Sequence, residues 1–497
     1  MTSRATAAIA IWRARNVRTT GDRAYLVYMV LMVALVTVIP VARAVWLSVT
    51  SAEGIAVLAS PAAPRVTTLV VAALWAGAML LGRDRGPALL PPFPTHAFAT
   101  SDLSLSDTFR GPVLRAVACV TALTTTIAGF IGVGLRSSGL LDPLGAGVFV
   151  ATGALVGVVA TVAWLAGQVF PRAAVPIALS ILALGTSTVA IPAIQSFTPW
   201  GWVGLAYAGG GSPHIIGALT ALTAVLVVAV PVLMNRLDAA ELAAQAARWD
   251  SATTHATRMD FGAAATIYQG RPHRGRRLRA VRPIRRRAAV FLIRDAIGAV
   301  RTPGRLIVGV LAVAAAGALL TLAFAPALPG WALGAAAGVI LFAGLGPLTD
   351  GIRHAASVAA DFPIYGVSDE QLLASHALFP LSVTVVVLLA VVVGCSVAAG
   401  IAAAAPIISS LALGLLALIA RVSNAVKGPL PPALLTPIPT QVGDLGAAVR
   451  LTWALDGMLL VALAGASATL AFKSPILLVG VAVTLVGVGI KRWRHRG

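Results

Sequence analysis

The stretch RAAVFLIRDAIGAVRTPGRLIVGVLAVAAAGALLTLAFA, residues 287–325, contains both patterns on which the fold of this chain depends. In residues 287–301, apolar and charged residues recur with helical spacing. From residue 305 onward the stretch is an apolar run of about 20 residues, the length that an α-helix needs to cross the hydrocarbon core of a bilayer. The stretch therefore predicts a helix at the membrane surface, followed by a membrane-spanning helix.

The predicted surface helix separates its apolar residues from its basic residues. The apolar residues Val290, Ile293, Ile297 and Val300 fall on one side, and the basic residues Arg287, Arg294 and Arg301, which are seven positions apart, line the other. An amphipathic helix of this kind lies in the membrane interface. We expect it to form an elbow before the span, and a weaker pattern over residues 5–18 predicts a similar helix before the first apolar run.

The composition of the whole chain extends this interpretation. Over 497 residues, 58% are hydrophobic and 11% are charged, and the mean hydropathy is +0.92. Soluble domains contain about twice that charged fraction. Because the apolar runs lack the alternation of a membrane β-barrel, helices are the remaining way to pair the backbone in lipid. The sequence predicts an all-α, polytopic membrane protein.

We predict about 12 transmembrane helices. Their approximate ranges are 24–47, 65–82, 112–135, 144–167, 173–195, 214–235, 305–325, 328–347, 376–400, 403–421, 448–470 and 474–490.

The basic residues predict the orientation of these spans. If the chain enters the membrane from the cytoplasm, all but four of its 37 Lys and Arg residues lie on the cytoplasmic side; the four are Arg43, Arg65, Arg136 and Lys473. Positive residues favour cytoplasmic loops. We therefore expect a multi-pass protein of a bacterial plasma membrane with both termini in the cytoplasm, and the net charge of +20 reflects this topology.

The chain divides into two six-helix halves, residues 1–235 and 287–497, joined by a basic cytoplasmic linker over residues 236–286. The approaches to the first and seventh spans are similar, since residues 17–23 read VRTTGDR and residues 300–305 read VRTPGR. A polar loop with a Phe-Pro pair follows the second span of each half, at Phe93-Pro94 and Phe362-Pro363. These features indicate two parallel repeats, each with an elbow helix.

Arginines crowd residues 271–287 of the linker, without the aromatic residues or recognisable fold of a nucleic-acid site. We therefore expect no nucleic-acid partner. Contact with anionic membrane lipids is the favoured interpretation, and an acidic surface on a protein partner is the alternative.

The predicted cytoplasmic loop over residues 349–375 is acidic instead of basic. Ser368 and Gln371 form a capping box, which predicts that a short helix begins there, and residues 101–109 are the counterpart in the first half. These segments are either the solvated starts of spans three and nine or docking sites for a soluble partner. The candidate docking residues are Ser101, Asp102, Asp107, Phe109, Ser368, Asp369, Glu370 and Gln371.

Ionisable side chains are scarce inside the predicted spans, where only Asp456 lies clearly within one. Ion-coupled carriers usually need carboxylates at this depth, and we favour a paired, structural role for Asp456. Cys119 and Cys395 lack the spacing of a metal or redox site, and no phosphate-binding loop precedes a lysine. We expect no cofactor, no metal and no catalytic residue in this chain.

The chain resembles the permease subunits of type-2 ABC exporters, in particular the long duplicated permeases of actinobacteria. The resemblance lies in the elbow with Arg294-Asp295 and Arg301-Thr302-Pro303, in the Pro-rich loops at 89–94 and 361–363, and in Pro199-Trp200-Gly201-Trp202, which is similar to an external re-entrant element. The second half departs from this pattern, because its last two spans are joined only by residues 472–474.

This resemblance implies an ATP-driven exporter in which separate ATPase subunits press on short coupling helices, here residues 101–109 and 368–375. ATP and magnesium would be bound by the partner subunits. With both halves in one chain, two ATPase subunits would complete a transporter, and a permease dimer is an alternative. An ion-coupled secondary carrier, a membrane scaffold and a lipid-modifying enzyme are the competing functions; external loops with only Glu53, Asp142 and His214 disfavour the enzyme.

Overall fold

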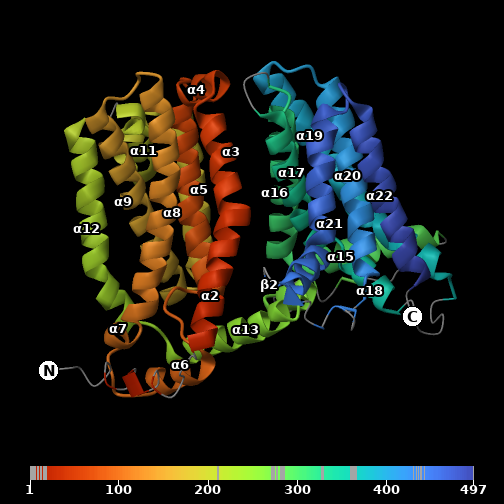
Figure 1. Cartoon of the computed structure of the whole chain (residues 1–497), viewed down its shortest axis with the longest axis horizontal. Coiled ribbons are helices and arrows are strands. Elements are labelled where there is room, and N and C mark those ends of the chain that lie inside the picture. The colour runs from red at the N-terminus through yellow and green to blue at the C-terminus, as the bar shows by residue number, and fades with distance from the viewer. Residues whose placement is uncertain are drawn as a thin grey trace. The chain divides into compact units, whose positions relative to one another are not determined.

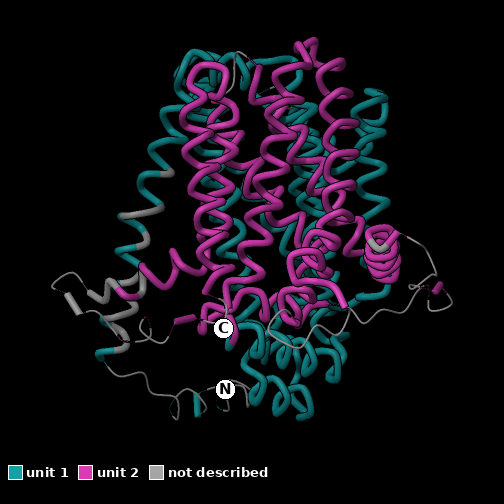
Figure 2. The backbone as a smooth tube through the Cα atoms, turned by 90° about the vertical axis from the view of Figure 1, so that its right-hand side faces the viewer, with its two compact units in different colours: residues 1–254 teal, residues 255–497 magenta. Residues whose placement is uncertain are grey.

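The computed structural model describes residues 7, 10–11, 14, 20–209, 212–269, 275, 278–279, 286–325, 329–358, 366–428, 430–431, 434, 436, 439–440 and 443–495. Within these residues the chain is helical except for loops and one antiparallel pair of two-residue strands. It forms two compact units, Met1–Thr254 and His255–Gly497, which Figure 2 distinguishes by colour. The predicted all-α class is confirmed.

Unit 1 contains the helices α2 to α13, most of which are labelled in Figure 1. They are α2 (Thr20–Val33), the π-helical turn η1 (Ala34–Val38), α3 (Ile39–Val49), α4 (Ala52–Leu58), α5 (Ala63–Asp84), α6 (Pro92–Ala99), α7 (Leu105–Thr108), α8 (Arg110–Ser137), α9 (Pro143–Val169), α10 (Ala174–Ala190), η2 (Pro192–Phe197), α11 (Pro199–Leu205), η3 (Tyr207–Gly209), α12 (Pro213–Asn235) and α13 (Ala239–Thr257).

Unit 2 contains α14 to α22 and both strands. They are α14 (Phe261–Ile267), α15 (Arg287–Arg301), α16 (Pro303–Leu322), α17 (Gly330–Leu345), η4 (Gly346–Leu348), α18 (Asp350–Val358), α19 (Asp369–Ala399), α20 (Ala404–Ala425), β1 (Pro439–Thr440), β2 (Gly443–Asp444), α21 (Leu445–Leu470) and α22 (Pro475–Arg494).

Ten helices of the described residues are long and apolar enough to cross a membrane: α5, α8, α9, α12, α16, α17, α19, α20, α21 and α22. Each of them matches one predicted span. The predicted fifth span falls on the shorter apolar helix α10, and the first falls on α2, η1 and α3, where a π-helical turn interrupts the α-helix. The chain is a multi-pass membrane protein, and the total of 12 spans stays a prediction.

Large apolar side chains cover the outer surface of these helices. Val228 on α12 and Val397 on α19 are 77% and 78% exposed, and Val386 and Val483 are exposed as well. In water such a surface would associate, because contiguous apolar patches of this extent mark contact with a partner or a membrane. The exposed belt therefore fits a lipid environment.

Small residues bring the spans into close contact. A side chain at Gly334 or Gly338 of α17 would overlap the backbone of α21 at Gly465 and Val461. In unit 1, a side chain at Gly157 of α9 would overlap α8 at Thr121 and Thr124. These contacts follow the general preference of membrane helices for small residues where they pack together.

The predicted domain limits differ from the units that the structure forms. Residues 239–257 of the predicted linker are the helix α13, which buries Leu242 and Gln245 against the rest of unit 1. The division between the units lies at residues 254 and 255, inside this helix, instead of at residues 235 and 287. The linker over residues 236–286 therefore begins as a folded part of unit 1.

Candidate functional site at the basic end of unit 2

We call the end of unit 2 at which α17 ends and α19 begins its basic end, because arginines of α15, α16 and α22 lie there. In Figure 1, α15 runs across this end of the bundle and α18 lies nearby. The elbow predicted for residues 287–301 is therefore a separate helix, α15, which ends at Arg301 immediately before α16 begins at Pro303. Proline at the first position of a helix is favourable because its missing N–H would have no partner there.

The elbow helix packs through a third face that the two-sided sequence pattern does not show. Phe291 packs against the cluster around Ile352, and Ala296 and Ala299 pack against the core of the spans. The predicted apolar residues Val290, Ile293 and Ile297 are half-buried, and Val300 is 47% exposed. The face formed by these four residues is available to lipid, so the helix can contact the bundle and the membrane at the same time.

A buried acid–histidine pair joins the elbow to α19. Oδ2 of Asp295 lies 2.6 Å from Nδ1 of His376, and their side chains are 9% and 0% exposed. The ring of Phe291 meets the imidazole edge-on at 4.9 Å. A Cβ at Gly351 would lie 2.5 Å from Nδ1 of His376, so only glycine leaves room for this pair. Because both partners are buried, the pair holds α15 in one position on the bundle.

A second acid joins α16 to α18. Asp350 accepts hydrogen bonds of 2.8 and 3.2 Å from both terminal nitrogens of Arg305 and pairs also with Arg353. Two-point binding between a guanidinium and a carboxylate fixes direction as well as distance. The start of α16 and the start of α18 are therefore tied together at the basic end.

Between these two pairs lies a cavity of about 380 Å³. Its wall is basic at Arg294, Arg301 and Arg305 and apolar at Leu348 and Phe379. Asp295, Asp350 and His354 also line it. Volumes of this size accept a small organic ligand, and a mostly apolar wall with a few charged groups is the usual composition of such sites.

His354 of α18 has an altered protonation equilibrium. Burial lowers the pKa of its imidazole, and the positive charge of Arg294 and the neighbouring His376 lower it further, while Asp295 acts in the opposite direction. Burial disfavours the charged form of a histidine. His354 therefore stays neutral to a lower pH than an exposed histidine does.

The candidate docking residues of unit 2 lie at the start of α19. Ser368 is the N-cap, and its Oγ accepts a hydrogen bond of 3.3 Å from the backbone N–H of Gln371. The predicted helix start is thus confirmed, but the helix continues to Ala399 and is the start of a span instead of a separate short helix. Asp369 is half-buried, and Glu370 and Gln371 are exposed.

The candidate docking residues of unit 1 are divided between the surface and the core. Ser104, not Ser101, caps a helix: its Oγ lies 2.7 Å from Oδ2 of Asp107 and 3.3 Å from the backbone nitrogen of that residue. Ser101 instead donates to the carbonyl of Phe98 at the end of α6. Ser101, Asp102 and Asp107 are exposed, whereas Phe109 is completely buried and cannot meet a partner directly.

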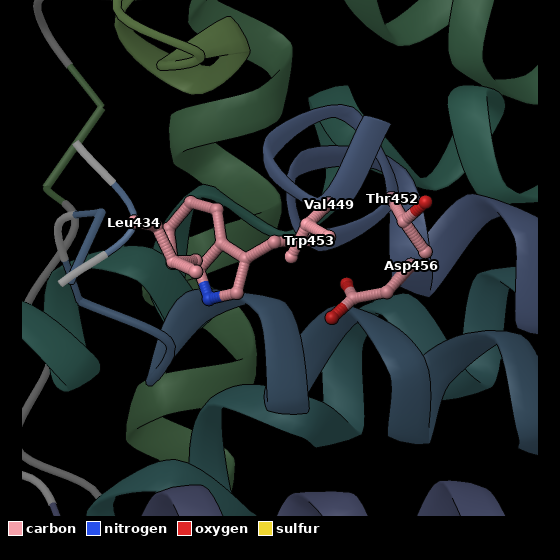
Figure 3. A pocket seen from close by; sticks show the side chains of 5 residues that line it. All are labelled: Leu434, Val449, Thr452, Trp453 and Asp456. Carbon is pink, nitrogen blue, oxygen red and sulfur yellow. The ribbon is translucent and has the colours of Figure 1, made fainter. Parts of the chain in front are cut away.

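Asp456 is paired, as its sequence context predicts. Its carboxylate lies 2.9 Å from Nζ of Lys427 and also pairs with Arg492 of α22. Burial lowers the pKa of the Lys427 amine, and the hydrogen bond with Asp456 acts against this. Figure 3 shows the carboxylate of Asp456 and the indole of Trp453, one turn apart on α21, beside a cavity of about 380 Å³.

The elbow and the acidic segments follow from the sequence pattern, but the partners of Asp295, Asp350 and Asp456 do not. One signal was available, because Asp295 is the only acid in the elbow and would be unfavourable in an interface unless it were paired. Among the described residues, no group of three or more His, Cys, Asp or Glu side chains is arranged to hold a metal ion.

Comparison with known protein families, with curated proteins and with solved structures finds no match to this chain.

Proposed function

We propose that the chain is the permease subunit of an ATP-driven exporter and that separate ATPase subunits energise it. The observation that carries the proposal is the construction of the two loops that follow the second span of each unit, after α5 and after α17. Both contain short helices anchored on the bundle and lead to acidic side chains near the start of the next span. These are the positions at which a soluble subunit could push on the membrane helices.

The anchoring is similar in the two units. In unit 1, Phe98 of α6 and Phe109 next to α7 pack into the same buried cluster. In unit 2, Ile352 and Ala355 of α18 are completely buried beside Leu372 of α19. A force on such a helix would be transmitted to the spans, because closely packed interiors deform little.

Shared helix contacts support a repeat of two six-helix halves. The second span contacts the fifth in both units, as α5 with α10 and α17 with α21. The fourth span likewise contacts the sixth, as α9 with α12 and α20 with α22. The first span contacts the third in both units, as α3 with α8 and α16 with α19, but α16 also packs along the second span, α17, whereas α3 contacts the short helix α4. The likeness of the halves thus lies mainly in spans two to six.

The pairing of Asp456 weighs against an ion-coupled carrier. A coupling carboxylate must exchange its ion or proton during transport, whereas Asp456 is held by Lys427 and Arg492. Both of its partners are positively charged, so the carboxylate is occupied within the fold. We therefore favour energy supplied from outside the chain, with ATP and magnesium bound by the partner subunits.

The expected orientation places both termini, the 236–286 segment and the basic end of unit 2 in the cytoplasm of a bacterium, following the distribution of basic residues. Cysteine scanning in intact cells tests it. A cysteine at position 260 should resist a membrane-impermeant reagent, and a cysteine replacing Glu53 should react. Labelling at position 260 from outside would contradict this orientation.

The main test is charge reversal at the start of α19. The double variant Asp369→Lys/Glu370→Lys should reduce copurification of an ATPase subunit, because like charges would replace complementary ones. Glu53→Lys is the matched control, since Glu53 is exposed in the first turn of α4. The control should leave copurification unchanged.

Transport by the purified chain alone in vesicles decides between the exporter and the carrier. Uptake driven by a proton or sodium gradient without any ATPase would overturn the proposal. The stoichiometry follows from the mass of the purified complex: one chain with two ATPase subunits is expected, and two chains would indicate a permease dimer.

A further inference from the structure

We propose that the cavity between α15, α16 and α18 binds the phosphate group of an anionic phospholipid, held by Arg294 and Arg301. This inference concerns a ligand site and does not depend on an ATPase partner. It rests on the chemistry of the cavity wall, on the state of the two arginines and on the apolar surface beside the cavity.

The two arginines have binding capacity that the described residues leave unused. Within the described part of the chain, the guanidinium of Arg294 makes no hydrogen bond or ion pair. Arg301 donates to the carbonyl of Leu278 at 2.9 Å, while its Nε is buried without a partner. Buried donors are almost always paired in native proteins, and an unpaired one is costly. An anion in the cavity would supply the missing acceptor.

The charge of the cavity wall favours an anion. Arg294, Arg301 and Arg305 line it together with Asp295 and Asp350. Asp295 is already paired with His376, and Asp350 with Arg305 and Arg353, so neither carboxylate neutralises Arg294 or Arg301. Arginine binds phosphate oxygens with two parallel hydrogen bonds, which makes phosphate the anion that suits this wall best.

The size and position of the cavity point to a lipid as the source of the phosphate. Its volume of about 380 Å³ equals that of roughly a dozen water molecules, far more than an inorganic phosphate fills. Leu348 and Phe379 supply an apolar floor. Beside the cavity, the first turns of α16 expose Ile307, Val308 and Leu311, which are 56%, 63% and 61% exposed. An acyl chain could lie along this surface while the headgroup occupies the cavity.

Binding is tested with the full-length protein in an uncharged detergent. The probes are dioctanoyl phosphatidylglycerol, inorganic phosphate and dioctanoylglycerol, which lacks phosphate, and the readout is the dissociation constant from intrinsic tryptophan fluorescence. We expect saturable binding of phosphatidylglycerol, with inorganic phosphate and dioctanoylglycerol at least tenfold weaker. Equal affinity for inorganic phosphate would overturn the lipid source, and equal affinity for dioctanoylglycerol would overturn the phosphate site.

Arg294→Gln should weaken phosphatidylglycerol binding at least about tenfold, because a hydrogen bond to a charged group is lost. Arg294→Lys should retain part of the affinity, since it keeps the charge but not the paired hydrogen bonds. The matched control is Arg258→Gln, because Arg258 is exposed and does not line the cavity. Unchanged affinity in Arg294→Gln would contradict the proposal.

A variant that keeps every charge gives a second, independent test. Gly298 lines the cavity, and a Cβ there would have no atom within 4 Å, so a larger side chain enters open space. Gly298→Leu should therefore fold as the wild type does and block the lipid, lowering its affinity at least tenfold. Wild-type affinity in Gly298→Leu would overturn the proposal. No ATPase or transport enters these assays, so their failure leaves the proposed function untouched.

Discussion

At the basic end of unit 1, where α5 ends and α8 begins, an amide network and an arginine–tryptophan stack tie α13 to the bundle, whereas ion pairs hold the helices together in unit 2. Gln168 of α9 and Gln245 of α13 hydrogen-bond each other at 3.1 Å, and both bond the backbone of the loop after α5. Arg85 of that loop stacks on Trp249 at 3.3 Å. In unit 2, Asp295, Asp350 and Asp456 each bind a basic side chain or a histidine.

The two ends are therefore sensitive to different changes. A neutral amide network depends on shape and on full hydrogen bonding, and the protonation state of a carboxylate does not affect it. The ion pairs of unit 2 depend on charge, and their basic residues outnumber the acids. Unit 2 therefore combines a rigid attachment with positive charge at Arg294 and Arg301 that an anionic ligand can use.

The largest expected effect comes from removing a charge in unit 2. Asp456→Asn leaves Lys427 and Arg492 without a negative partner and should destabilise the protein by about 3 kcal/mol. Gln168→Leu in unit 1 leaves backbone groups of Ala88 unpaired and should cost about 1–3 kcal/mol. Thermal unfolding in detergent measures both. A smaller loss in Asp456→Asn than in Gln168→Leu would break the proposed contrast between the units.

A smaller loss is expected where both ends need a glycine. A Cβ at Gly351 would displace the Asp295–His376 pair, and a Cβ at Gly86 would overlap the side-chain amide of Gln168. Gly351→Ala and Gly86→Ala should each cost about 1–3 kcal/mol, as overpacking usually does. Gly304→Ala and Gly111→Ala are the controls, because a Cβ there meets open space. Similar unfolding temperatures in all four variants would show that neither attachment needs this close approach.

The smallest expected effect is a pH dependence that belongs to unit 2. The pKa of His354 is lowered in the fold, so the unfolded chain takes up a proton at a higher pH than the folded chain does. Its contribution to stability is complete above the ordinary value of 6.5 and is lost as the pH falls through the folded pKa. His354→Gln should make the loss of stability below pH 6.5 shallower, as measured by unfolding temperature against pH. An equally steep loss in the variant would show that other groups cause it.

Much of the local structure could be predicted because its signals lie within a few residues. The apolar runs predicted the ten spans within several residues of their observed limits, and Ser368 and Gln371 predicted the start of α19. The signal for the end of α19 is also local, because Gly400 follows the helix and adopts a φ of +65°, a conformation that favours glycine. The sequence did not predict α13 as part of unit 1, because its polar composition resembles that of a linker.

The candidate site was predictable only in part. The elbow and the acidic segments each consist of consecutive residues. The partners of their charged groups, however, are distant in the chain. Asp295 and His376 are 81 residues apart, and Arg305 and Asp350 are 45 residues apart. A single sequence contains no signal that joins such positions, so neither of these pairs nor the cavity between them could be predicted.

The sequence by itself determined that this chain is helical and crosses a membrane many times, because backbone hydrogen bonding in lipid leaves few choices and an apolar run of about 20 residues specifies a span. The sequence also determined the amphipathic elbow, because the helical spacing of its apolar and basic residues lies within one short segment. Only the tertiary structure decided which helices touch and which charges pair. Close contact between Gly334 and Gly465, and the pairing of Asp456 with Arg492, depend on packing among many helices at once.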